Sequence, residues 1–147
     1  MDKIIAKDVF VRAGLPVCGY VATSAEEISA DIEKVAAHIE SELGYPVYIK
    51  PANMGSSVGI TKATDKKTLT EGLQLAAKYD RRVLAEEGIN CREIETAVLG
   101  NYNIEASVTG EIVATDDFYD YDSKYIDDGK PKMKIPADLP AEISDKI

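Results

Sequence analysis

Lys50-Pro51-Ala52-Asn53-Met54-Gly55-Ser56-Ser57-Val58-Gly59-Ile60 is the stretch of this 147-residue sequence that decides its fold. The β-branched residues around it predict one strand over residues 47–50 and a second over 58–61. The Pro, Asn, Gly and Ser residues between them are typical of turns, so we expect an antiparallel hairpin. Gly and Ser leave backbone N–H groups accessible, and a loop of this kind that follows a Lys can bind phosphate oxygens.

The segment 50–60 lacks the two best-known phosphate-binding fingerprints. No Gly-Lys-Ser/Thr follows the glycine, which excludes a Walker A loop, and the GxGxxG pattern of dinucleotide-binding folds is absent. On spacing alone, an ordinary hairpin turn is therefore favoured over a phosphate site.

Helical periodicity and capping signals surround the hairpin. Ser24 and Glu27 form a capping-box pattern, and Asp65 is a helix N-cap residue. A layer of helices against a mostly antiparallel sheet follows, which places the chain in the α+β class. The expected elements are helices over residues 2–13, 24–44 and 65–79 and strands over 16–21 and 83–86.

The pattern changes after Gly88. Strand-like runs separated by Gly-containing turns predict a second sheet, and the last residues, 136–147, read as the start of a helix. We therefore expect two domains, residues 1–89 and a truncated residues 90–147, as in an excised part of a longer protein. The runs of the second sheet cover residues 94–99, 104–108 and 111–115.

Composition excludes several classes of function. A net charge of -9 disfavours binding to nucleic acid or to an anionic membrane, and no apolar run is long enough to cross a bilayer. The N-terminus lacks an export signal, so we expect a cytoplasmic protein. Cys18 and Cys91 lack a metal-ligand spacing and are interpreted as structural thiols, and the single His38 supports neither a triad nor a metal site.

Two other polar segments were candidates for chemistry. Glu86 and Glu87 are adjacent in a predicted strand and point to opposite faces, so they cannot flank one bond as glycosidase carboxylates do. The run from Phe118 to Tyr125, FYDYDSKY, alternates aromatic and acidic residues, which is unusual for a linker. Its plainer interpretation is a loop whose rings cover the edge of the second sheet.

Three segments together resemble the D-alanine–D-alanine ligase family of the ATP-grasp enzymes, including its vancomycin-resistance relatives. They are KPANMGSSVGI, EIETAVLG from Glu93 and FYDYDSKY, in the family's order and spacing. The opening MDK and the late IPADLPAEI also resemble family segments, so the resemblance covers essentially the whole chain. It implies an ATP-grasp fold, with the first nucleotide-gripping subdomain followed by the truncated start of the second.

The resemblance also implies roles for individual residues. Lys3 and Lys50 resemble the two lysines that hold the ATP phosphates, which suits ammonium groups because they neutralise charge on a phosphoryl group in transfer. Ser56 and Ser57 resemble the serines of the loop that closes over those phosphates. Glu86 resembles the family's acceptor for the exocyclic amine of adenine.

Further roles fall on both predicted domains. Ile89 matches the adenine-contacting stretch, and Glu93 matches the carboxylate on the ribose hydroxyls. Lys124 resembles a lysine that reaches the phosphates from the far side, and Tyr125 resembles a tyrosine that links with Ser56 on closure. Ser56, Lys124 and Tyr125 are therefore the expected catalytic residues.

The implied reaction uses ATP and Mg²⁺ to join D-alanine to a second D-alanine, or to D-serine, for peptidoglycan synthesis. The first carboxylate takes the terminal phosphoryl group, and the second amine then displaces phosphate from the acyl phosphate. No metal ligands are expected within these residues, and the parent protein is expected to be a homodimer. The alternatives are a catalytically inactive ATP-grasp-like nucleotide- or protein-binding module and another carboxylate–amine ligase, which FYDYDSKY disfavours.

Overall fold

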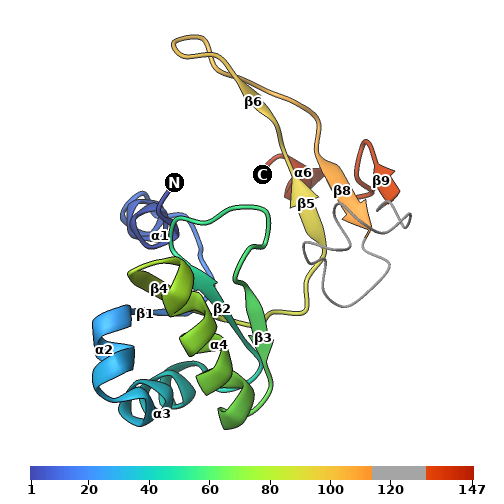
Figure 1. Cartoon of the computed structure of the whole chain (residues 1–147). Coiled ribbons are helices and arrows are strands. Elements are labelled where there is room, and N and C mark those ends of the chain that lie inside the picture. The colour runs from blue at the N-terminus through green and yellow to red at the C-terminus, as the bar shows by residue number, and fades with distance from the viewer. Residues whose placement is uncertain (114–131) are drawn as a thin grey trace. The chain divides into compact units, whose positions relative to one another are not determined.

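The computed structural model describes residues 1–113 and 132–147, which form two compact units. The first unit is Met1–Ile89 and the second is Asn90–Ile147. Each unit has its own antiparallel sheet (Figure 1). Within the described residues, no helix is both long enough and apolar enough to cross a membrane.

The first unit contains a four-stranded sheet in the order β1-β4-β2-β3, and every neighbouring pair is antiparallel. The predicted α+β class is confirmed, as is the hairpin, in which β2 pairs with β3. The hairpin's second strand begins at Thr61, later than predicted, because the residues before it form turns. The strands are β1 (Tyr20–Ser24), β2 (Val47–Pro51), β3 (Thr61–Ala63) and β4 (Arg82–Glu87).

The strand predicted over residues 16–21 is displaced toward the C-terminus. Pairing with β4 begins where Tyr20 faces Glu86 and ends at Ser24. Pro16 has no N–H to donate and Gly19 is a weak strand former, so the residues before Tyr20 form the connection from the preceding helix.

Four helices of the first unit follow the predicted order, with one additional break. Their bounds are α1 (Lys3–Arg12), α2 (Ala25–Ala30), α3 (Ile32–Leu43) and α4 (Lys66–Tyr79). The capping box of Ser24 and Glu27 and the Asp65 cap are both confirmed. The prediction of one continuous helix over 24–44 was wrong, because Asp31 leaves helical geometry and its carboxylate accepts the Lys34 amide at 3.0 Å, which starts α3.

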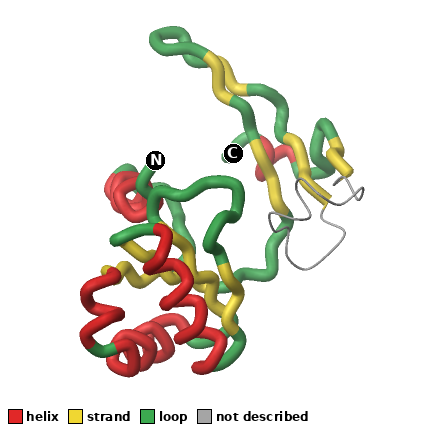
Figure 2. The backbone as a smooth tube through the Cα atoms, in the orientation of Figure 1, coloured by secondary structure: helices red, strands yellow, loops and turns green. Residues whose placement is uncertain are grey.

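The main core lies between one face of the sheet and helices α2, α3 and α4 (Figure 2). Gly72 brings α4 close to the sheet, since a Cβ there would lie 2.4 Å from Thr61 Oγ1. The buried core residues are Ile28, Ala36, Ile39, Val47, Ile49, Ala63, Leu69, Leu73, Ala76, Val83 and Ala85.

The opposite face of the same sheet is only partly covered. Strand alternation places Tyr48 and Lys50 of β2 on this face, because Val47 and Ile49 point into the main core. Helix α1 covers part of it, where Ile4 packs against Ala52 and Leu84. We call this face of the sheet, which carries Tyr48, Lys50 and Glu86, the open face.

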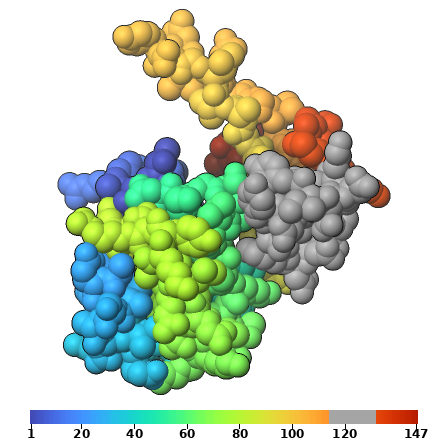
Figure 3. All heavy atoms as spheres, in the orientation of Figure 1, coloured from blue at the N-terminus to red at the C-terminus, as the bar shows by residue number. Residues whose placement is uncertain are grey.

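Among its described residues, the second unit contains a three-stranded sheet in the order β5-β8-β9 and a separate β6–β7 hairpin, which extends away from the rest of its unit (Figure 3). The predicted runs 94–99 and 104–108 are interrupted, so each contributes shorter strands than expected. The bounds are β5 (Glu93–Glu95), β6 (Val98–Leu99), β7 (Glu105–Ala106), β8 (Gly110–Val113), β9 (Lys132–Lys134) and α6 (Ala141–Ser144).

Candidate functional site

The N-terminus of α1 attaches Lys3 to the hairpin loop. Asp2 caps α1 by accepting the Ile4 amide at 2.9 Å, and its other oxygen lies 2.6 Å from Arg82 Nη1. The Lys3 ammonium then donates to three backbone carbonyls where β2 runs into the loop. Those carbonyls belong to Pro51 at 3.0 Å, Ala52 at 3.3 Å and Met54 at 2.5 Å. Lys3 therefore holds the base of the loop as well as contributing charge.

Glu86 is the most buried carboxylate of the open face, with 8% of its surface exposed. Its Oε1 lies 2.9 Å from the Lys7 ammonium, and its Oε2 forms an ion pair and hydrogen bond with Lys50. Burial by itself would raise the pKa of Glu86, but the Lys50 and Lys7 ammonium groups outweigh it and lower that pKa below its ordinary value. Glu86 is therefore an ionised acceptor held between two cations.

Lys3, Lys7 and Lys50 concentrate positive charge around this one glutamate. Burial lowers the pKa of Lys3, and repulsion from Lys50 lowers it further. Counting Arg82, which pairs with Asp2, four cations lie near the three carboxylates Glu86, Asp2 and Asp80, so the cluster has a small positive excess on a chain whose net charge is -9. Such a cluster favours an anionic ligand.

Sequence reasoning did not identify Lys7 as a site residue, although a signal for it was present. It lies four residues after Lys3, on the same face of α1, and only 9% of it is exposed. Its ammonium also lies 3.1 Å from Cys18 Sγ and 5.2 Å from the centre of the Tyr20 ring. Burial opposes its charge, yet the contacts with Glu86 and Cys18 raise the pKa of Lys7 overall. Cys18 and Cys91 are both free thiols.

Tyr48 is a second residue that sequence reasoning missed. The ammonium groups of Lys50 and Lys62 lie over its ring, at 5.9 Å and 6.0 Å from the ring centre. Alternation along β2 could have placed it beside Lys50, because residues two apart in a strand share a face. The open face therefore combines cations, one carboxylate and an aromatic ring.

The loop after β2 contains a tight turn formed by the two candidate serines. Ser56 and Ser57 have φ angles of 50° and 61°, and the Val58 amide donates to the Gly55 carbonyl at 3.0 Å. Two consecutive positive φ values with this hydrogen bond define a type I′ turn. Positive φ costs a residue other than glycine about 1–2 kcal/mol, so the turn stores strain where a ligand is expected.

Gly59 fixes the other end of this loop. Its φ is 72°, and a Cβ there would lie 2.7 Å from Tyr79 Cδ2 and 2.8 Å from Pro51 Cγ. Gly55, four residues earlier, has no such neighbour within 4 Å. The loop is therefore packed tightly at Gly59, where it leads back to β3, and has open space at Gly55, near its tip.

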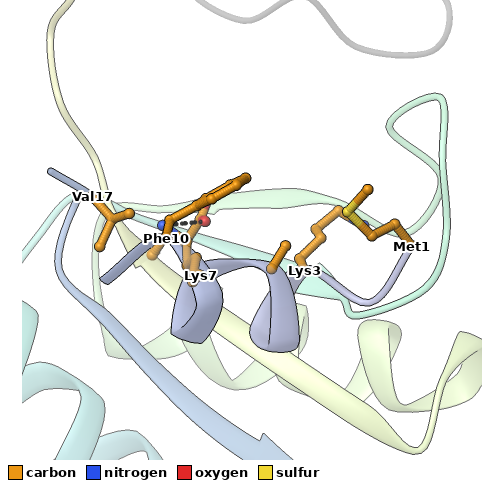
Figure 4. Close-up of a pocket in the computed structure, with 7 residues that line it drawn as sticks. Met1, Lys3, Lys7, Phe10 and Val17 are labelled. Carbon is orange, nitrogen blue, oxygen red and sulfur yellow. Dashed lines mark ion pairs between the residues drawn. The ribbon is translucent and has the colours of Figure 1, made fainter. Parts of the chain in front are cut away.

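A pocket of about 330 Å³ lies beside the cluster, between α1 and the start of the chain (Figure 4). Lys7 and Glu86, which form an ion pair, line it together with the apolar side chains of Phe10 and Val17. The lining residues are Met1, Lys3, Ala6, Lys7, Phe10, Val17 and Glu86.

Of the remaining predicted residues, one belongs to the first unit, one to the second unit, and two lie outside the described residues. Ile89 follows β4 and is 52% exposed, and Glu93 is an exposed residue of β5 in the second unit. Lys124 and Tyr125, with the whole FYDYDSKY run, lie outside the described residues. Among residues 1–113 and 132–147, no group of three His, Cys, Asp or Glu side chains is placed to hold a metal ion.

Comparison with known proteins identifies the family. The family model described as "D-ala D-ala ligase C-terminus" matches residues 9–147. The chain belongs to the D-alanine–D-alanine ligase family. This membership confirms the resemblance and the predicted ATP-grasp fold. It does not favour the alternative of a catalytically inactive binding module.

Relatives and solved structures agree with this family membership. The D-alanine–D-alanine ligases of Thermoanaerobacter sp. (strain X514) and Macrococcus caseolyticus are 52% and 46% identical over the whole chain. The VanG D-Ala:D-Ser ligase structure from Enterococcus faecalis matches 99% of the chain and 41% of its own, with a TM-score of 0.82 and 35% identity. The chain spans 40% and 41% of the lengths of the two curated relatives.

Proposed function

We propose that this chain is an ATP-binding part of a ligase that joins D-alanine to a second D-alanine or to D-serine. The observation that carries the proposal is the lysine cluster around Glu86, beside the strained serine turn, in a chain of this family. The cluster supplies cations for phosphates and one fixed acceptor, and the family membership supplies the reaction.

The phosphates of ATP would be bound at the end of β2. Lys50 and Lys3 provide ammonium groups there, and Ser56 and Ser57 provide the backbone of a narrow turn. Gly55 leaves open space at the tip, so phosphate oxygens can approach the main chain. An ionised Glu86 would accept the exocyclic amine of adenine.

The other groups of the reaction are assigned from the family. Glu93 would bind the ribose hydroxyls, with Ile89 near the base, while Lys124 would bind the phosphates and Tyr125 would link with Ser56. Magnesium would compensate charge on the phosphoryl groups. As the family resemblance implies, we place its ligands in regions that the relatives have and this chain does not span.

The second substrate is a D-amino acid, D-alanine or D-serine. Curated D-alanine–D-alanine ligases at 46% and 52% identity support the first, and the VanG D-Ala:D-Ser ligase structure at 35% identity supports the second. The product would serve peptidoglycan synthesis in the cytoplasm, and the complete enzyme would act as a homodimer.

The test is steady-state dipeptide synthesis by a ligase that carries these residues together with the other regions of its relatives. Lys50→Ala is expected to lower turnover about a hundredfold or more, because it removes a positive charge that stabilises the phosphoryl group in transfer. Lys78→Ala is the matched control, since Lys78 is an exposed lysine in the last turn of α4. Wild-type turnover in Lys50→Ala, or no ATP-dependent dipeptide from the parent, would overturn the proposal.

A further inference from the structure

Lys50 and Glu86 would have conflicting tasks in the proposed site. Lys50 neutralises Glu86 by a direct ion pair. When Lys50 turns to a phosphate, Glu86 loses that partner while remaining buried. A buried carboxylate without a cation tends to take up a proton, and a protonated carboxyl is a poorer acceptor for an amine.

Lys7 can resolve this conflict because it holds the other oxygen of the same carboxylate. Its ammonium lies 2.9 Å from Glu86 Oε1, whereas Lys50 pairs with Oε2. Lys7 comes from α1, not from β2, so movement of Lys50 leaves its contact intact.

The surroundings of Lys7 hold its ammonium in place. Cys18 Sγ accepts from it at 3.1 Å, and the Tyr20 ring lies 5.2 Å from it. Tyr20 is itself held by its hydroxyl, which donates to Asp8 at 2.6 Å. With 9% of its surface exposed, Lys7 has little freedom to reach a phosphate in solvent.

We infer that Lys7 is a positioning residue that keeps Glu86 ionised and oriented when Lys50 binds nucleotide phosphate, and that it thereby sets the preference for adenine. The inference rests on the proposed function, because it requires ATP at this site. Adenine presents an amine donor to Glu86, whereas hypoxanthine presents a carbonyl oxygen that an ionised carboxylate repels. Lys7 acts on the base through Glu86 and needs no contact of its own.

Calorimetric titration of the 147-residue chain with ATP and with inosine triphosphate tests this role. Wild type is expected to prefer ATP, and Lys7→Met should lose about tenfold more affinity for ATP than for inosine triphosphate. Lys7→Arg retains the charge and should retain the preference. Lys78→Met is the matched control and should leave both affinities unchanged.

The outcomes separate this inference from the proposed function. If wild type binds no ATP, both fail. If wild type prefers ATP and Lys7→Met lowers the affinity for both nucleotides equally, Lys7 serves only the packing of α1, and the inference alone fails. Should Lys7→Met not fold, Lys7→Arg decides the question, because loss of the preference in a folded Lys7→Arg chain also overturns the role.

Discussion

Substitution of Gly59 by alanine tests how the serine loop is anchored. A Cβ at this position would lie 2.7 Å from Tyr79 Cδ2 and 2.8 Å from Pro51 Cγ, and φ is 72°. The positive φ costs about 1–2 kcal/mol and the overpacking about 1–3 kcal/mol, so the free energy of unfolding should fall by roughly 2–5 kcal/mol. For a unit of this size, the midpoint temperature of thermal unfolding should fall by about 10 °C or more.

Thermal unfolding followed by circular dichroism measures this loss, with Gly55→Ala as the matched control. A Cβ added at Gly55 would have no neighbour within 4 Å, so this substitution should change stability by less than about 1 kcal/mol. Adding Tyr79→Ala to Gly59→Ala removes one of the two close contacts and should recover about 1 kcal/mol. Equal midpoints for Gly55→Ala and Gly59→Ala would refute the reasoning.

Three further changes probe the cluster and the closed site. The pKa of folded Glu86 lies below its ordinary value, so the stability that Glu86 contributes is present above the ordinary pKa and is lost as the pH falls through the folded pKa. In denaturant titrations, the free energy of unfolding should therefore fall less at acid pH in Glu86→Gln than in wild type. Parallel pH profiles of the two proteins would contradict this. Asp2→Ala removes the cap of α1 and a contact with Arg82, so urea unfolding should show a loss of about 1–2 kcal/mol, and no loss would mean that the cap is dispensable. In the complete ligase, Tyr125→Phe should lower turnover severalfold, since the hydrogen bond to Ser56 that we propose would be worth about 0.5–1.5 kcal/mol; unchanged kinetics would exclude that bond.

Local signals predicted most of the first unit's fold. The capping box at Ser24 and the cap at Asp65 operate over a few residues, so the sequence displays them directly. The break at Asp31 was not predicted, because the apolar stripe continues across it and the capping preference of one Asp is weak beside that pattern. The displaced start of β1 depends on pairing with β4, a contact distant in sequence.

The candidate site was predictable only where its residues lie in motifs. Lys3, Lys50 and Glu86 could be named from the family resemblance, and the structure brings them together. Lys7 and Cys18 contact each other through the packing of α1 on the sheet, which no spacing rule indicates. Tyr79 illustrates the same limit, since its ring at the end of α4 reaches Gly59.

Nuclear magnetic resonance mapping of ATP on the 147-residue chain tests the central claim most directly. ATP should shift the amides of Lys50, Gly55, Ser56 and Glu86, which belong to the open face and its loop. Lys50→Ala should abolish those shifts, because it removes a phosphate-binding cation. Shifts confined instead to the pocket beside α3, around Val21 and His38, or no shifts with ATP, would contradict the account.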